Sequence, residues 1–146
     1  MRKKYILLVE DNPDDEELTI MALRHSKIAN EVVVAHDGVE ALTYLFGSGQ
    51  PSDGMVVDLP QVILLDLKMP RLGGLDVLKR IRSELSTQLL PVVILTSSSE
   101  EEDILSSYRL GANSYVRKPI EFQRFAEAIQ QLGLYWLIVN QAPPLR

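Results

Sequence analysis

The chain has 146 residues, of which 46% are hydrophobic and 24% are charged, and it contains no cysteine. This composition predicts one globular domain spanning residues 1–146 and excludes a disulfide framework, a thiolate metal site and a thiol nucleophile. The net charge of −5 disfavours a nucleic-acid-binding surface, and no stretch approaches the roughly 18 apolar residues of a membrane span. We therefore expect a cytoplasmic protein that binds neither nucleic acid nor membrane.

Short apolar runs alternate with segments of helical periodicity along the whole chain. Strands are predicted at residues 5–9, 31–35, 61–66, 91–95 and 113–117. Several of them are apolar nearly throughout, which is typical of strands buried on both faces of a sheet. Five β-α units in succession predict an α/β fold, a doubly wound parallel sheet with right-handed crossovers and helices on both faces.

Capping residues mark where some of the helices begin. Asn12, followed by proline and acidic residues, predicts the start of the first helix. Before the helix that follows the fourth strand, either Ser98 with Glu101 or Ser99 with Glu102 is spaced as a capping box.

The C-terminal part is the most apolar segment outside the strands. One helical face is expected to join the core and consists of Phe122, Phe125, Ala126, Ile129 and Leu132. Residues 133–146 extend beyond it, and residues 134–139 are apolar on all sides. This extension either covers the core or forms a subunit interface. We favour a homodimer interface, with contacts from Tyr135, Trp136, Leu137 and Ile138.

Polar residues stand where the predicted strands end. Strands one, three, four and five lead to Glu10-Asp11, Asp66, Thr96 and Lys118. Ligands bind outside the carboxyl ends of strands in such sheets, so we expect these side chains to converge. Three carboxylates repel one another unless a hard cation such as Mg²⁺ binds them. The alternative, that the acids only cap helices, does not suit Asp66, because it ends a run of four apolar residues.

An aspartate beside a metal ion, a hydroxyl and an ammonium group suits the transfer of an anionic group. Phosphoryl transfer needs an in-line nucleophile and compensation of the charge on the phosphoryl oxygens. We therefore predict that Asp66 is the nucleophile, and that the cation, Thr96 and Lys118 hold the phosphoryl oxygens.

These residues and their order resemble the receiver domain of bacterial two-component response regulators. Residues 66–74, DLKMPRLGG, match that family's D-x-x-M-P-x-x-x-G signature, and residues 110–112 and 115–119 match its closing region. The resemblance covers about residues 5–132. It implies the flavodoxin-like strand order 2-1-3-4-5, with residues 133–146 as an extended C-terminal helix or tail.

The resemblance also implies roles for single residues. Asp66 would accept a phosphoryl group from a sensor histidine kinase or a phosphotransfer protein, without turnover of a small molecule. Asp11, Asp66 and the backbone carbonyl of Lys68 would bind Mg²⁺, and Glu10 would act through water. Lys68 and Ser98 would line the route of attacking water and tune the lifetime of the phosphoryl group.

A conformational switch is implied as well. Thr96 and Tyr115 would form the switch pair, in which the hydroxyl moves toward the phosphoryl group and the ring turns inward. The Lys118–Pro119 peptide bond is often cis in this family. The long loop at residues 47–60, the extension and the expected lack of an output domain are also similar to the small response regulators that accompany bacterial phytochromes. That narrower resemblance implies a phytochrome-type kinase and a homodimer.

Two other classes of function are weighed against the phosphoacceptor. A phosphatase that forms an aspartyl phosphate resembles D-x-D at its nucleophile, but Lys68 occupies the second acidic position here. An interaction module that no longer takes phosphate is disfavoured by the intact acids and by the presence of Thr96 and Lys118.

Overall fold

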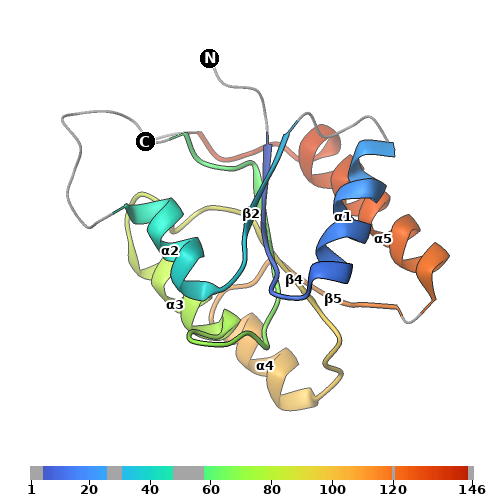
Figure 1. Ribbon diagram of the computed structural model, residues 1–146. Coiled ribbons are helices and arrows are strands. Elements are labelled where there is room, and N and C mark those ends of the chain that lie inside the picture. Colours follow the sequence, from blue (N-terminus) through green and yellow to red (C-terminus); the bar gives the residue numbers. More distant parts are fainter. Residues whose placement is uncertain (1–4, 26–30, 48–57, 120, 145–146) are drawn as a thin grey trace.

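A five-stranded parallel sheet forms the centre of the computed structural model, which describes residues 5–25, 31–47, 58–119 and 121–144 (Figure 1). The strands are β1 (Tyr5–Val9), β2 (Glu31–Ala35), β3 (Val62–Leu65), β4 (Val92–Thr96) and β5 (Ser114–Arg117). Their order in the sheet is β2-β1-β3-β4-β5. The predicted fold class, strand order and strand positions are therefore confirmed, with strand ends that differ by one residue at most.

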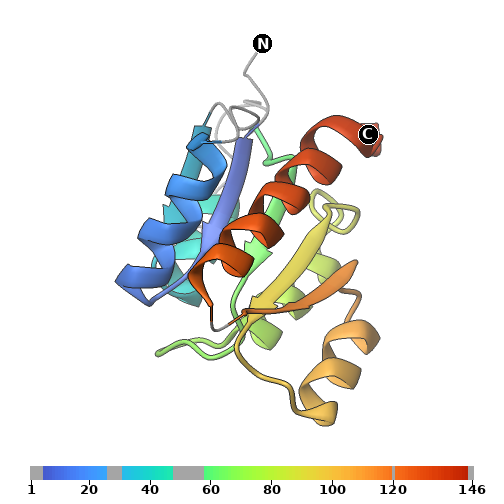
Figure 2. The same ribbon diagram turned by 90° about the vertical axis from the view of Figure 1, so that its right-hand side faces the viewer.

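Helices cover both faces of this sheet. They are α1 (Pro13–His25), α2 (Gly38–Phe46), α3 (Gly74–Ser83), α4 (Glu101–Arg109) and α5 (Phe122–Leu134), which continues into a π-helical turn, η1 (Tyr135–Val139). Figures 1 and 2 show α1 and α5 side by side on one face, with α2 and α3 on the other. Among the described residues, no helix is long and apolar enough to span a bilayer.

Two apolar clusters fix the helices to the sheet. Successive strand residues point to opposite faces, so Ile63 packs toward α2 and α3 while Leu64 packs toward α1 and α5. All four residues of β3 are buried, as expected for a central strand. The sheet is held on both sides, and the carboxyl ends of β1, β3, β4 and β5 lie along one edge.

The predicted cap of α1 is confirmed, whereas the predicted cap of α4 is wrong. Asn12 Oδ1 accepts hydrogen bonds from the backbone N–H groups of Asp14 and Asp15, at 2.9 and 3.0 Å. The N-cap of α4 is Glu100, and its side chain makes no capping hydrogen bond. The Ser98 hydroxyl donates to the carboxylate of Asp103, and its oxygen accepts from the backbone N–H of Glu100 at 3.3 Å, so it binds the residue before the helix instead of capping the first turn.

The C-terminal segment divides its apolar residues between core and surface. Trp136 and Leu137 are buried in the same cluster as Leu23 and Ile129, while Tyr135 and Ile138 are exposed. Phe122 also departs from its expected place in the core: it is the first residue of α5 and is 55% exposed. The buried residues of α5 begin about one turn later, at Phe125.

Candidate functional site

The carboxyl ends of the strands bring three acidic side chains together. Carboxylate oxygens of Glu10, Asp11 and Asp66 lie within 4.8 Å of one another. Glu10 follows β1 and Asp66 follows β3, and the pairing of these strands continues in a 3.1 Å hydrogen bond from Asp66 N to Val9 O. The two acids are almost fully buried, with Glu10 1% exposed and Asp66 8% exposed. Buried carboxylates repel one another and require cationic partners.

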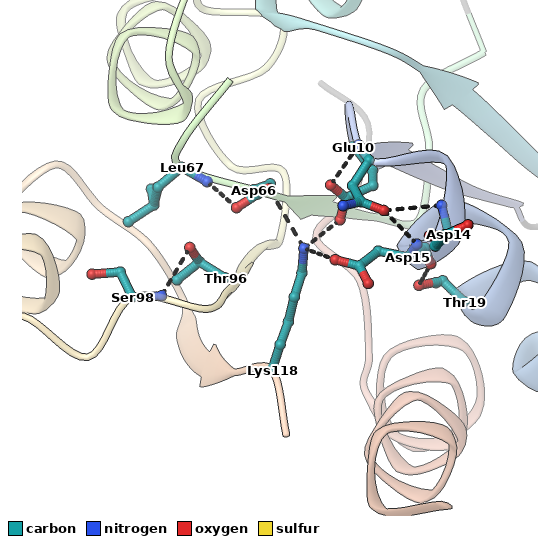
Figure 3. A network of polar contacts seen from close by, with 10 residues as sticks. Glu10, Asp14, Asp15, Thr19, Asp66, Leu67, Thr96, Ser98 and Lys118 are labelled. Atoms are coloured by element: carbon teal, nitrogen blue, oxygen red, sulfur yellow. Dashed lines mark hydrogen bonds and ion pairs between the residues drawn. The ribbon is translucent and has the colours of Figure 1, made fainter. Parts of the chain in front are cut away.

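Lys118 supplies one cationic partner. Figure 3 shows its side chain reaching from the end of β5 toward the carboxylates. Nζ donates to Glu10 Oε1 at 2.6 Å and to Asp15 Oδ2 at 2.9 Å, and it lies 3.5 Å from Asp66 Oδ2. β5 pairs with β4, and a 2.7 Å hydrogen bond from Lys118 N to Thr96 O places the lysine beside the end of β4.

Asp15 is a member of this site that sequence reasoning missed. Its place in the first turn of α1 is explained equally well by attraction to the positive end of the helix. The available signal was that α1 begins at the edge of the sheet where the site forms. An acid in the first turn of such a helix can therefore face the site, as Asp15 does (Figure 3).

The pKa values of Glu10 and Lys118 are both raised, which favours the neutral form of the glutamate and the charged form of the lysine. Burial raises the pKa of Glu10 from 4.5 to about 7, although the hydrogen bond from Lys118 opposes this shift. Burial alone would lower the pKa of Lys118, but hydrogen bonds to Glu10 and Asp15 and the charge of Asp66 raise it to about 12. The ammonium thus stays charged at neutral pH. Glu10 therefore holds a proton more readily than an ordinary glutamate does.

The signature glycine, Gly74, supports the backbone of Asp66. A Cβ atom on Gly74 would lie only 2.1 Å from the Asp66 carbonyl oxygen. Gly74 N donates to Leu67 O at 2.9 Å, and Leu67 N donates to Asp66 Oδ1 at 2.8 Å. The start of α3 therefore packs directly against the loop that carries Asp66 and fixes the orientation of one carboxylate oxygen.

Comparison with known proteins identifies the architecture. The family model for the response regulator receiver domain matches residues 6–130. The chain belongs to this family. Its members are phosphoacceptors that bind a divalent metal ion and work with histidine kinases or phosphotransfer proteins.

Individual relatives narrow the comparison. Response regulator Rcp1 from Synechocystis is 34% identical over 92% of this chain and 89% of Rcp1. Its Mn²⁺-bound structure has a TM-score of 0.85 at 33% identity, covering 97% of this chain and 99% of that one. The phosphorylated cyanobacterial phytochrome response regulator RcpA has a TM-score of 0.88 at 36% identity, covering 98% and 100%. The bacteriophytochrome response regulator RtBRR is 50% identical, with a TM-score of 0.73 and coverage of 98% and 86%. This receiver domain is close to phytochrome response regulators.

The predicted switch residues of the receiver domain lie next to the acids. Thr96 is fully buried at the end of β4, and its hydroxyl oxygen lies 3.4 Å from Ser98 N. The Tyr115 ring is half-buried against the core, and its hydroxyl donates to Ser98 O at 2.9 Å. Burial raises the pKa of Tyr115, so the phenol remains a donor at neutral pH. The Lys118–Pro119 bond is trans, which differs from the cis form implied by the resemblance.

The residues expected to line the water route are joined by a further acid. Lys68 Nζ lies 3.4 Å from Asp103 Oδ2, and Ser98 Oγ donates to the same oxygen at 2.6 Å. Asp103 belongs to α4 and is 8% exposed. No prediction from the sequence included Asp103, because an acid in the first turn of a helix is ordinarily explained by the helix dipole.

Proposed function

We propose that the protein is a signalling phosphoacceptor that takes one phosphoryl group on Asp66, with Mg²⁺ as its cation. The observation that carries the proposal is the position of the Asp66 carboxylate. It is buried at the end of β3, with carboxylate oxygens of Glu10 and Asp11 within 4.8 Å and the Lys118 ammonium 3.5 Å away. A buried carboxylate that faces both acids and an ammonium group is better suited to the transfer of an anionic group than to a purely structural role in the core.

The transfer step uses groups that are already in place. One Asp66 carboxylate oxygen forms a bond to the phosphorus of a phosphohistidine, while the bond from phosphorus to the imidazole nitrogen breaks. The nitrogen keeps the electron pair of that bond. In the loose transition state, negative charge spreads over the three equatorial phosphoryl oxygens. Lys118 and Thr96 are assigned as donors to two of these oxygens, since both side chains end at the edge of the sheet that carries Asp66.

The acidic cluster fits a hard divalent cation. Its ligand atoms are all oxygens that lie within 4.8 Å of one another, and an incomplete oxygen set that leaves room for water suits Mg²⁺. We assign Asp11, Asp66 and the Lys68 backbone carbonyl as ligands, with Glu10 acting through water. When bound, the cation offsets charge on the phosphoryl oxygens.

Thr96 and Tyr115 are assigned as the switch that reports phosphorylation. The Thr96 hydroxyl would turn toward the phosphoryl group, which leaves space behind it for the ring of Tyr115. The hydrogen bond from Tyr115 to Ser98 O supports this assignment. Ser98 lies on the loop that follows Thr96, so this hydrogen bond connects the two proposed switch residues.

The proposed phosphodonor is a sensor histidine kinase of phytochrome type or a phosphotransfer protein. The names of RcpA and RtBRR, which both refer to phytochromes, support the phytochrome link. We propose that residues 1–146 act as a single receiver domain in the cytoplasm, with residues 133–146 as its extension. Its only reactions would be its own phosphorylation and slow dephosphorylation. The homodimer stays a prediction, supported by the exposed Tyr135 and Ile138.

Intact mass measurement after incubation with Mg²⁺ and acetyl phosphate tests the proposal. We expect the wild-type chain to gain one phosphoryl group, and Asp66→Asn and samples with excess chelator to gain none. The matched control is Asp76→Asn, which removes an exposed acid of α3 and should leave the gain unchanged. A folded wild-type chain that gains no phosphoryl group would support the interaction-module alternative instead.

A further inference from the structure

We propose that Asp103 is a positioning residue that draws Lys68 and Ser98 together over the phosphoryl site and so lengthens the lifetime of the aspartyl phosphate. The inference rests on the proposed phosphorylation of Asp66. Its basis is one carboxylate oxygen with two partners. Asp103 Oδ2 accepts a 2.6 Å hydrogen bond from Ser98 Oγ and lies 3.4 Å from Lys68 Nζ.

These contacts join two loops that carry the chemistry. Lys68 lies two residues after Asp66, in the segment that follows β3. Ser98 lies two residues after Thr96, in the segment that follows β4. β3 and β4 are neighbours in the sheet, so both loops leave the same edge. Asp103 thus links the loop of the acceptor to the loop of the hydroxyl that is assigned to bind the phosphoryl group.

The carboxylate of Asp103 binds side chains of these two loops. Although Asp103 lies in the first turn of α4, the N-cap of that helix is Glu100 and makes no side-chain cap. The hydrogen bond from Ser98, helped by Lys68, holds the pKa of Asp103 below its ordinary value despite burial. Asp103 is therefore charged at neutral pH. A charge-assisted hydrogen bond of this kind is among the stronger ones that a side chain makes.

The bridge that Asp103 forms between Lys68 and Ser98 affects hydrolysis of the aspartyl phosphate. A water oxygen forms a bond to phosphorus while the bond between phosphorus and the Asp66 oxygen breaks. Asp66 regains its carboxylate, and inorganic phosphate leaves with the protons of the water. This water must approach in line, from the side opposite Asp66. Side chains of Lys68 and Ser98 that are held together over the acceptor restrict this approach, and they separate if Asp103 is removed.

The same bridge connects α4 to the switch. Tyr115 donates its hydroxyl hydrogen to the carbonyl of Ser98, the residue whose side chain Asp103 binds. Holding Ser98 in place therefore also holds the acceptor for the inward ring. Because Asp103 belongs to α4, a partner that displaces the first turn of this helix would shorten the phosphoryl lifetime through the same contact.

The experiment measures loss of the phosphoryl group after the phosphodonor is removed. Wild-type, Asp103→Ala and Asp103→Asn chains are phosphorylated with acetyl phosphate and Mg²⁺, desalted into Mg²⁺ buffer and followed by intact mass. We expect Asp103→Ala to lose phosphate about three- to tenfold faster, the factor that corresponds to one ordinary hydrogen bond. Asp103→Asn should fall between the two, because its amide oxygen still accepts from Ser98 while its charge for Lys68 is gone.

The matched controls remove an acid from the same helical turn. Glu102 is exposed and pairs with Ser106 at 3.4 Å, away from both loops. Glu102→Ala and Glu102→Gln should therefore decay at the wild-type rate. Circular dichroism of each variant confirms folding. If Asp103→Ala does not fold, Asp103→Asn, which keeps the shape of the side chain, carries the comparison.

A second arm asks whether Asp103 acts through its two partners. In a Lys68→Met, Ser98→Ala background, adding Asp103→Ala should change the decay rate by less than about twofold, because residues of one network are not additive. A full additional effect in that background would overturn the inference. So would an unchanged or longer lifetime in folded Asp103→Ala. A wild-type chain that gains no phosphoryl group overturns the proposed function as well, whereas equal lifetimes in phosphorylated chains overturn this inference alone.

Discussion

Two regions of the molecule hold side chains in surroundings that are unusual for them. One is the polar cluster, which comprises Glu10, Asp15, Asp66 and Lys118. The other is the C-terminal segment, residues 134–139. In the polar cluster, charged groups are buried at the edge of the sheet. In the C-terminal segment, large apolar side chains are exposed on α5 and η1, beside the buried Trp136 and Leu137.

The two regions meet this problem in different ways. Within the polar cluster, one ammonium faces three carboxylates, so an excess of negative charge remains that a divalent cation can balance. In the C-terminal segment, the chain's own core takes up Trp136 and Leu137, and a second surface would be needed to cover Tyr135 and Ile138. Buried charge thus points to chemistry performed by the domain itself, whereas exposed apolar surface points to contact with another molecule. The following predictions probe this distinction, beginning with the largest effect.

Lys118→Met should have the largest effect, because it removes the cation of the polar cluster. We expect phosphorylation by acetyl phosphate to slow by about 10²- to 10³-fold, as for loss of one preorganised donor to a developing charge. Intact mass against time gives the rate. Lys118→Arg should recover part of it, and Lys79→Met, which changes an exposed lysine of α3, should match the wild type. A Lys118→Met chain that is phosphorylated at the wild-type rate would remove Lys118 from the site.

A pair of neighbouring substitutions should separate the two sides of the C-terminal segment. Leu137 is buried and Ile138 is 61% exposed. Leu137→Ala should lower the free energy of unfolding by about 2–5 kcal/mol, and Ile138→Ala should change it by about 0.5 kcal/mol or less. Urea unfolding, followed by the fluorescence of Trp136, the single tryptophan, measures both. Equal losses would contradict the division of this segment between core and surface.

The success of sequence reasoning also differs between the two regions. The strands were predictable because runs such as Val62 to Leu65 are buried on both faces, so local composition alone identifies them. Because the strands are parallel, the polar residues that end such runs are then expected to lie close together at one edge of the sheet. Asp66, Thr96 and Lys118 do lie at neighbouring strand ends, as that reasoning requires.

The helical contributions to the site were not predictable in this way. Asp15 and Asp103 both occupy the first turn of a helix, where an acid is favoured by the dipole whatever it faces. Whether it caps its helix or reaches into a site depends on how the helix packs on the sheet. The same dependence separates Trp136 from Tyr135: a run that is apolar on all sides does not reveal which face meets the core.

Metal binding should depend on pH through the polar cluster. The pKa of Glu10 is about 7 in the metal-free protein and 4.5 in its ordinary state. A raised carboxyl pKa stabilises the protonated fold, so Glu10's contribution to stability without metal should fall as pH rises from 4.5 to about 7. Mg²⁺ must displace this proton, so its affinity should rise by up to about tenfold per pH unit below about 7 and level off above.

Calorimetric titration with Mg²⁺ at about pH 6 and about pH 8 measures this dependence. Glu10→Gln has no proton to lose and should show a flatter profile. Equal slopes in the two chains would assign the titration to another group. Proton release at the lower pH, read from buffers of different ionisation enthalpy, gives a second measure of the same event.

Ile138→Glu should have the smallest effect on the fold and a selective effect on association. The side chain is exposed, so a charge there should change the free energy of unfolding by no more than about 0.5 kcal/mol. In a dimer interface, the same carboxylate would lose its water and weaken association. Sedimentation of wild-type and Ile138→Glu chains over a range of concentrations distinguishes the cases. A wild-type dimer that the substitution dissociates would assign this surface to a second copy. A wild-type monomer at every concentration would contradict the homodimer, and a dimer that tolerates the charge would place the interface elsewhere.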